Sequence, residues 1–199
     1  MMKKNIIQTG MLMLGLICLL ATGCFMDKPL ETTAVQGTVY QLNLKLPFAI
    51  KAEPKDMNLD PSTAVFVQKA QSCMERPTGE DLHMAEFAVN TFDQENINQS
   101  YGDEDNEKVQ QFYKNFGQVL TDSYIKSLTK AANMTDVSTE SKVAEIDGRE
   151  ATVTTVQCKM KGEDETLKII YINDPAESWL IALAYPKEKQ DGIGRKIDE

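Results

Sequence analysis

The feature that most constrains the fold is one long stretch of helical periodicity, Glu107 to Ala132, in a chain whose other apolar segments are patterned as strands. Its apolar residues recur at spacings of three and four, which places them on one face of a helix. We therefore predict a single long amphipathic helix, with Asp103, Asp105 and Asn106 as candidate N-caps. The apolar positions are Val109, Phe112, Tyr113, Phe116, Val119, Leu120, Tyr124 and Leu128.

Strand patterns precede this helix. Thr38 to Leu46 alternates apolar and polar residues with the period of a strand that buries one face. Ala64 to Met74 and Leu82 to Phe92 flank the turn Arg76-Pro77-Thr78-Gly79, so they are predicted to form an antiparallel hairpin.

The last third of the chain is also rich in strand patterns. Asp147-Gly148 between two such runs is a strong hairpin signal. Two later runs, 167–172 and 179–185, carry apolar residues on both faces, as expected for central strands that are covered on both sides. The predicted strands are 142–146, 151–160, 167–172 and 179–185, and residues 191–199 are predicted to begin a short terminal helix.

This pattern predicts an α+β fold, in which one antiparallel β-sheet is packed by a long central helix and a short C-terminal helix. The order of elements, with the hairpin "EIDGREATVTTVQC" and the closing strand "SWLIALAYPKE", resembles the PsbP/Mog-like sandwich. The resemblance implies a binding or assembly role and no shared catalytic set, so no functional residue is carried over. The alternative is a cystatin-like α+β fold, although that fold usually places its main helix before the strands.

The beginning of the chain has the layout of a secretory signal: Lys3 and Lys4 precede an uncharged, largely apolar run that ends in "LLATGC" at Cys24. That ending resembles the lipobox of bacterial lipoproteins. The resemblance implies that Cys24 carries a diacylglyceryl group and becomes the first mature residue. We therefore predict a signal peptide at 1–23, a lipidated flexible tether at 24–37 and a single α+β domain at 38–199. The alternative is an ordinary cleaved signal with an incidental cysteine beside it.

Net charge narrows the class of partner. Loss of Lys3 and Lys4 with the leader reduces 21 basic residues to 19 against 30 acidic ones, which takes the net charge from −9 to −11. Such a surface repels phosphate backbones, so nucleic acid is not an expected partner. The expected location is extracytoplasmic, on the cell membrane or the outer membrane, held there by the lipid on Cys24. Phe25 rather than aspartate follows Cys24, which by analogy with lipoproteins favours the outer membrane where there are two.

Cys73 and Cys158 remain outside the leader and the lipidation site. In an extracytoplasmic protein they can form a disulfide, or they can remain reduced and buried, since each lies in an apolar strand pattern.

Motifs for chemistry are sparse. His83 is the only histidine, so a multi-histidine zinc site is excluded, and a Cys73/His83 nucleophile pair is disfavoured because Cys73 lies in an apolar run. The acidic stretch Asp93 to Glu107 fails the EF-hand pattern and is expected to be a solvated loop before the helix. The aromatic residues of the helix are expected to pack in the core rather than line a ligand site. No cofactor and no metal are predicted.

The sequence therefore predicts a lipid-anchored cell-envelope protein that serves as a non-catalytic binding or assembly module. Its partner would be an envelope protein or a small ligand, bound at loops around Lys51 to Ser62 and Asp93 to Asn106. The alternative is a small envelope hydrolase, which would show a polar pocket containing a perturbed Cys73, His83 or carboxylate.

Overall fold

The computed structural model describes residues 31–37, 39–46, 50–59, 61–77, 82–103, 106–146 and 148–198. These belong to one compact unit, Glu31–Glu199. The leader, Cys24 and the start of the predicted tether lie outside the described residues.

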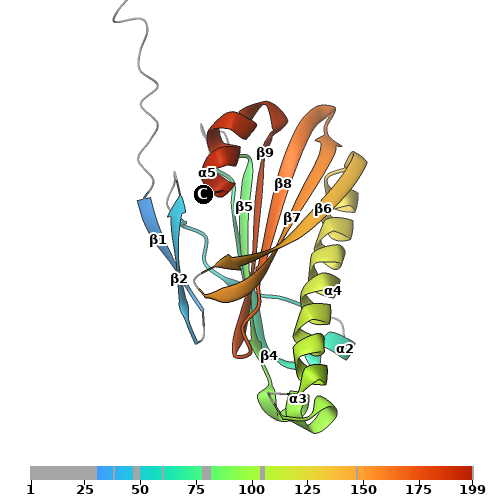
Figure 1. The fold of residues 1–199 in the computed structure, drawn as a ribbon. Helices are drawn as coiled ribbons and strands as arrows, with labels where there is room; N and C mark the ends of the chain where they lie inside the picture. The colour runs from blue at the N-terminus through green and yellow to red at the C-terminus, as the bar shows by residue number, and fades with distance from the viewer. Residues whose placement is uncertain are drawn as a thin grey trace, which may run out of the picture. The chain divides into compact units, whose positions relative to one another are not determined.

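The unit is built on a seven-stranded antiparallel sheet in the order β3-β4-β5-β9-β8-β7-β6 (Figure 1). The predicted α+β class, with one long central helix and a short C-terminal helix, is confirmed. The strands of this sheet are β3 (Lys55–Asp56), β4 (Val67–Glu75), β5 (Met84–Phe92), β6 (Thr135–Ile146), β7 (Arg149–Met160), β8 (Glu163–Ile172) and β9 (Glu177–Pro186). The remaining elements are β1 (Glu31–Gln36), β2 (Gln41–Leu46), α2 (Pro61–Ala64), α3 (Gln94–Tyr101), α4 (Glu107–Ala131), η1 (Lys187–Lys189), η2 (Gln190–Gly194) and α5 (Arg195–Asp198).

Strand β9 is the centre of the sheet, and its alternate side chains enter two separate hydrophobic clusters. Leu180 and Ala182 belong to the cluster under α4. Trp179 and Ile181 belong to the second cluster, which includes Leu46 of β2. Successive strand residues point to opposite faces, so the two clusters cover the sheet on both sides at β9. The apolar run from Trp179 to Tyr185 predicts this arrangement. Figure 1 shows α4 on one side and the β1–β2 hairpin with the C-terminal helices on the other.

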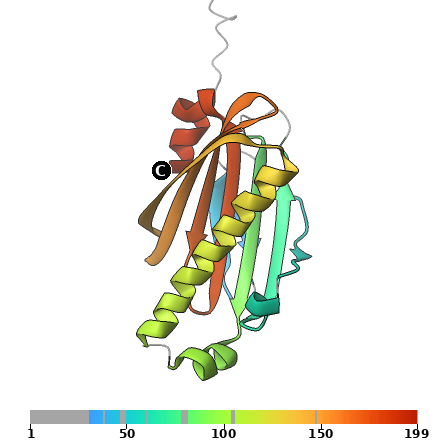
Figure 2. The ribbon, with the colours of Figure 1, turned by 90° about the vertical axis from the view of Figure 1, so that its right-hand side faces the viewer.

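Helix α4 crosses the first face diagonally (Figure 2). Of the candidate N-caps, the side chain of Asn106 fills the role and accepts a hydrogen bond from the Lys108 N–H at 2.9 Å. Gly117 allows the helix to lie close to the sheet, since a Cβ there would lie 2.5 Å from Cδ1 of Tyr171. Gly117 therefore serves the packing of the helix against the sheet.

Tight turns set the register of the last hairpins. The pair Ile146 and Arg149 leaves a two-residue loop in which Gly148 has a φ of 75°, so the predicted Asp-Gly hairpin is confirmed. Lys161 and Gly162 have φ values of 55° and 89° and make a second two-residue turn, between β7 and β8. Both positive φ values are those of a type I′ hairpin turn.

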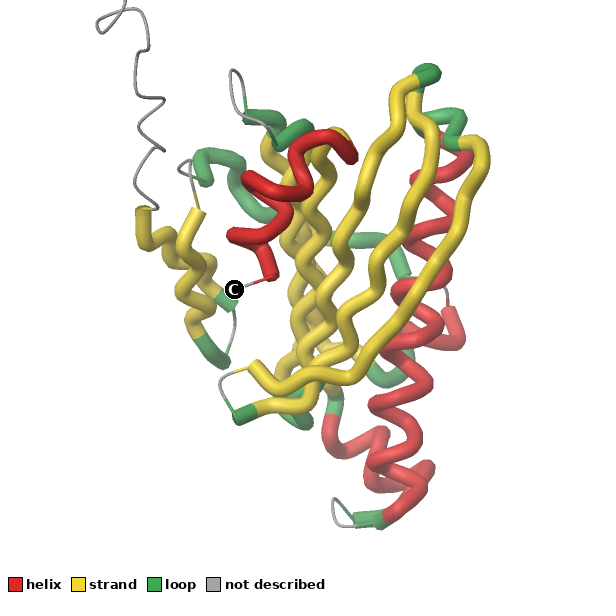
Figure 3. The backbone as a smooth tube through the Cα atoms, turned by 45° about the horizontal axis from the view of Figure 1, so that its top comes forward, coloured by secondary structure: helices red, strands yellow, loops and turns green. Residues whose placement is uncertain are grey.

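Two parts of the predicted organisation are wrong. Glu31–Gln36 was assigned to the flexible tether, but it forms β1 and pairs antiparallel with β2 (Figure 3). The α+β domain thus begins before residue 38. Asp93 to Asn106 was predicted to be a loop, but most of it is α3, whose N-cap Asp93 accepts a hydrogen bond from the Asn96 N–H at 3.1 Å.

Candidate ligand-binding groove

The largest group of aromatic side chains lies where α4, α3 and the start of β4 meet. Phe112 of α4 stacks at 5.1 Å between ring centroids on both Phe66 and Tyr101. Phe116 lies one turn further along α4, 6.0 Å from Phe112. These rings line a cavity of about 450 Å³ whose rim is polar. The rim residues are Ser62, Thr63, Lys108, Gln111 and Asn115.

A second cavity, of about 500 Å³, continues along α4 toward its C-terminal end. Its floor holds Glu86 of β5 and Tyr124 of α4. Its walls are mainly apolar and come from α4 and from the segment between β3 and α2. The apolar wall residues are Met57, Leu59, Phe116, Val119, Leu120, Leu128 and Ala131.

The two cavities adjoin, because Thr63, Phe116 and Val119 line both. The helix residues of the two cavities form one stripe with helical spacing between Lys108 and Ala131. We call this surface the α4 groove. Val119 lies in its middle and is 54% exposed, so it is accessible to a ligand in the groove. Figure 2 shows α2, which supplies the opposite wall, beside α4.

Glu86 is the carboxylate of the α4 groove. Its Oε2 accepts a hydrogen bond of 2.8 Å from the Tyr124 hydroxyl. Burial raises the pKa of Glu86, and the hydrogen bond from Tyr124 opposes that rise. Burial and the adjacent Glu86 charge raise the pKa of Tyr124, so the phenol remains a hydrogen-bond donor.

Both segments that the sequence singled out for binding contribute to the α4 groove. Lys51 to Ser62 supplies Met57, Asn58, Leu59 and Ser62, and Asp93 to Asn106 supplies Tyr101. The aromatic stripe of α4, expected to be core, packs in or against the hydrophobic cluster under the helix, and Phe112, Phe116 and Tyr124 in addition line the groove. Periodicity identifies the apolar face of a helix, but it does not show that the sheet covers only part of that face.

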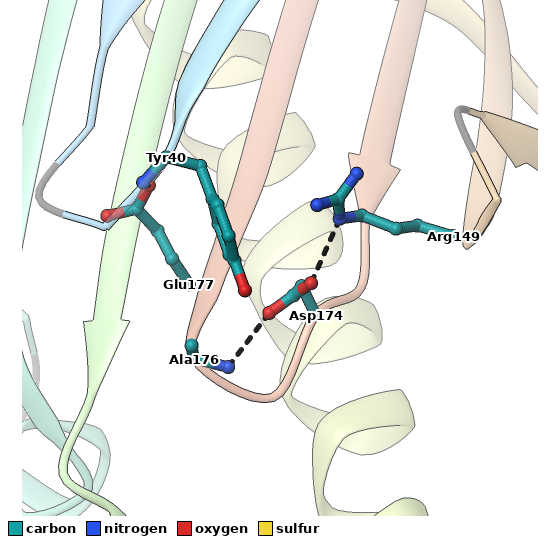
Figure 4. Close-up of polar contacts among 5 residues, drawn as sticks. All are labelled: Tyr40, Arg149, Asp174, Ala176 and Glu177. Carbon is teal, nitrogen blue, oxygen red and sulfur yellow. Dashed lines mark hydrogen bonds and ion pairs between the residues drawn. The ribbon is translucent and has the colours of Figure 1, made fainter.

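A third cavity, of about 500 Å³, lies between β2 and the second face of the sheet. Polar contacts at its edge hold the hairpin (Figure 4). Buried Glu177 accepts hydrogen bonds from the N–H groups of Val39 and Tyr40 at 2.9 and 3.2 Å. The guanidinium of Arg149 lies 4.9 Å from the centre of the Tyr40 ring. Arg149 also donates a hydrogen bond to Asp174 at 2.9 Å. The β1–β2 hairpin is thus held by backbone hydrogen bonds to Glu177 and by the contact of the Arg149 cation with the Tyr40 ring.

His83 lies at a polar cavity of about 750 Å³ near the C-terminal end of β9. Its Nδ1 is 2.9 Å from Oε1 of Glu165; the His83 side chain is 49% exposed and that of Glu165 is 3% exposed. Burial raises the pKa of Glu165, whereas the imidazole lowers it. A buried carboxylate thus orients a half-exposed imidazole, an arrangement that can serve a general base. The described lining of this cavity contains no serine, threonine or cysteine.

The structure does not bring Cys73 and Cys158 together. Both are free, and Cys158 packs in the cluster under α4 while Cys73 packs in the cluster on the other face of the sheet. The disulfide considered from the sequence is therefore not formed, and His83 pairs with Glu165 instead of Cys73. Burial raises the pKa of both thiols, which disfavours the reactive thiolate.

Within the described part of the chain, no group of three or more histidine, cysteine, aspartate or glutamate residues is placed to hold a metal ion. No helix among the described residues is both long and apolar enough to span a membrane. Cys24, the predicted lipidation site, lies outside the described residues.

No family model matches the chain, and no curated protein matches it. Solved structures that match include the crystal structure of PA94 from Pseudomonas aeruginosa, a protein of unknown function. It is 12% identical, with a TM-score of 0.35, and the match covers 84% of this chain and 92% of that one. The function proposed below is therefore based on the geometry of the chain itself.

Proposed function

We propose that this chain is a lipid-anchored cell-envelope protein whose α+β domain binds an apolar ligand in the α4 groove, without catalysis. The observation that carries the proposal is the run of two adjoining cavities, each near 500 Å³, lined by Phe66, Phe112, Phe116 and Val119 and rimmed by polar residues. Ligand sites are commonly concave and apolar, with a few polar groups that fix orientation. A small ligand is favoured over a protein partner because the apolar surface is recessed between α4 and α2.

The anchoring part of the proposal comes from the leader. The segment that ends at Cys24 resembles a lipobox, and a net charge of −9 for the whole chain gives little attraction to anionic headgroups. A diacylglyceryl group supplies membrane attachment that the protein surface does not, at about 0.8 kcal/mol for each buried methylene. The PsbP/Mog-like assignment belongs to the same proposal, supported by the order of strands and helices.

Binding is tested with a neutral apolar dye, N-phenyl-1-naphthylamine, whose fluorescence rises in apolar surroundings. We expect saturable binding by the domain. Val119→Lys, which places a charge in the middle of the groove, should weaken that binding at least about tenfold, because a bound apolar dye would cover the ammonium and withdraw it from water. The control Gln110→Lys adds the same charge on the exposed side of the same helix, outside both cavities, and should leave binding unchanged. Equal binding by the two variants would refute the groove as the site.

Attachment is tested by mass spectrometry of the protein from its own envelope, compared with a Cys24→Ser form. We expect an amino-terminal fragment that begins at Cys24 with added acyl mass, and release of the Cys24→Ser protein from membranes. An unmodified cysteine or an intact leader would contradict the proposed anchor.

A second candidate function, a small hydrolase, is favoured by one observation: Nδ1 of His83 lies 2.9 Å from a carboxylate oxygen of buried Glu165, beside a polar cavity. With no side-chain nucleophile in the described lining, His83 would have to activate water. Hydrolysis of p-nitrophenyl acetate that is lost in His83→Gln and retained in Val119→Lys would support this function. Equal rates for all three proteins would exclude it.

A further inference from the structure

Glu86 occupies an unusual place for a carboxylate. It projects from β5, near the middle of the sheet, onto the face that α4 packs against. Its register neighbours are Met74 on β4 and Ala182 on β9, both uncharged. Met84 and Ala88, which share its face of β5, belong to the hydrophobic cluster under α4. Glu86 is therefore flanked by apolar side chains on the face of the sheet that α4 covers.

The charge of this carboxylate has no cationic partner in the cavity that it lines. The described lining of that cavity contains no lysine, arginine or histidine. Lys108 is the basic residue of the adjoining cavity and lies 16 positions before Tyr124 on α4, about 24 Å along the helix axis. Among the described residues, the hydrogen bond that Glu86 makes comes from the neutral Tyr124 hydroxyl. An ionised carboxylate that is partly withdrawn from water gains free energy from a cation placed beside it.

We propose that the ligand of the α4 groove is a single-chain amphiphile with a protonated amine, whose ammonium pairs with Glu86 and whose alkyl chain lies along α4 toward Phe112. This inference depends on the proposed function, because it names the chemical class of ligand for the same groove. The stretch of helix from Tyr124 back to Phe112 is about 18 Å long, so an extended chain can lie against Val119 and Phe116 on the way.

Charge complementarity decides between amphiphiles with the same chain. An alkyl carboxylate would place a second negative charge beside Glu86, which is unfavourable in partly buried surroundings. An alcohol can donate one hydrogen bond to Glu86 but brings no charge. An ammonium both donates hydrogen bonds to Glu86 and carries the opposite charge. A hydrogen bond between charged groups is about twice as strong as a neutral one. Burial raises the pKa of Glu86, and the described lining of its cavity holds no cationic side chain that would lower it.

The test is displacement of N-phenyl-1-naphthylamine by dodecylamine, dodecanol and dodecanoate, each below its micellar concentration, at about pH 8, where the amine is protonated. We expect dodecylamine to displace the dye at a concentration at least about tenfold lower than dodecanol, and dodecanoate to be the weakest. Glu86→Gln keeps the shape of the side chain and removes its charge. It should abolish the preference for the amine over the alcohol while the dye still binds.

Two further variants make the result specific. Glu140→Gln removes a carboxylate from exposed β6, away from the groove, and should keep the amine preference. Tyr124→Phe removes the hydroxyl beside Glu86, keeps the ring and should keep the preference, because the charge remains. If the dye binds but the amine and the alcohol displace it equally, or if Glu86→Gln retains the preference, the ammonium inference is refuted while the groove survives. If the dye does not bind, the proposed function itself fails.

Discussion

Replacing Gly117 by alanine tests how α4 is seated on the sheet, which in turn sets the width of the α4 groove. A Cβ at this position would lie 2.5 Å from Cδ1 and 2.9 Å from Cζ of Tyr171. Tyr171 is 3% exposed and cannot swing into solvent without opening the core. Either the ring or the helix must therefore shift to admit the methyl group.

The magnitude follows from two opposing contributions. Overpacking a core contact costs about 1–3 kcal/mol of the free energy of unfolding, and a contact as short as 2.5 Å belongs in the upper part of that range, about 2–3 kcal/mol. Alanine in place of glycine within a helix increases the free energy of unfolding by about 1 kcal/mol. The net loss is then about 1–2 kcal/mol, and a domain of this size loses about 2–4 °C in Tm for each kcal/mol. We expect Gly117→Ala to lower Tm by about 2–8 °C.

Thermal unfolding followed by circular dichroism measures this shift. Gly192→Ala is the matched control, because a Cβ there meets no atom within 4 Å, and it should leave Tm unchanged or slightly higher. A Gly117→Ala protein as stable as the wild type, or more stable, would show that α4 does not depend on this close approach.

The remaining predictions concern other parts of the domain. Glu177→Gln should weaken the hold on the β1–β2 hairpin by about 1.5–3 kcal/mol, because a charged acceptor is lost, and limited proteolysis should then cut the hairpin sooner than in the wild type. Burial raises the pKa of Glu86 in the folded protein. The contribution of Glu86 to stability is therefore present below the ordinary glutamate pKa and is lost as pH rises through the raised value. Glu86→Gln should increase Tm at neutral pH and change it little near pH 4. Cys73 and Cys158 should react with a thiol reagent only on unfolding, and a protein that still shows neither thiol when unfolded without a reductant would contradict the fold.

Much of the fold could be predicted because it is local. The helical period of Glu107–Ala131 and the apolar run from Trp179 to Tyr185 in β9 each indicate their surroundings directly. The β1 strand could not be predicted in this way. "ETTAVQ" has no alternation, and it becomes a strand because β2 offers backbone partners. The short helix α3 was missed although Asp93 stands three residues before Asn96, since the acidic residues around it also fit a solvated loop.

The candidate groove could be predicted only in part. The two flanking segments could be identified from their loop-like composition. Glu86 could not, because a single carboxylate within the strand pattern of Leu82 to Phe92 is typical of a residue that faces solvent. Glu86 lines the groove because of where α4 crosses the sheet. That crossing depends on the contact between Gly117 and Tyr171, which are far apart in the chain. Contacts of that kind are set by the tertiary packing and leave no periodic signal in the sequence.

The most direct test of the central claim is a methyl NMR titration of the domain with N-phenyl-1-naphthylamine. Methyl groups of Val119, Leu120 and Leu128 line the α4 groove, whereas those of Ile170 and Ile181 line the cavity beneath the β1–β2 hairpin on the other face of the sheet. We expect saturable shifts confined to the first set. Shifts confined to the second set, or no saturable shifts at either, would contradict the assignment of the α4 groove as the binding site.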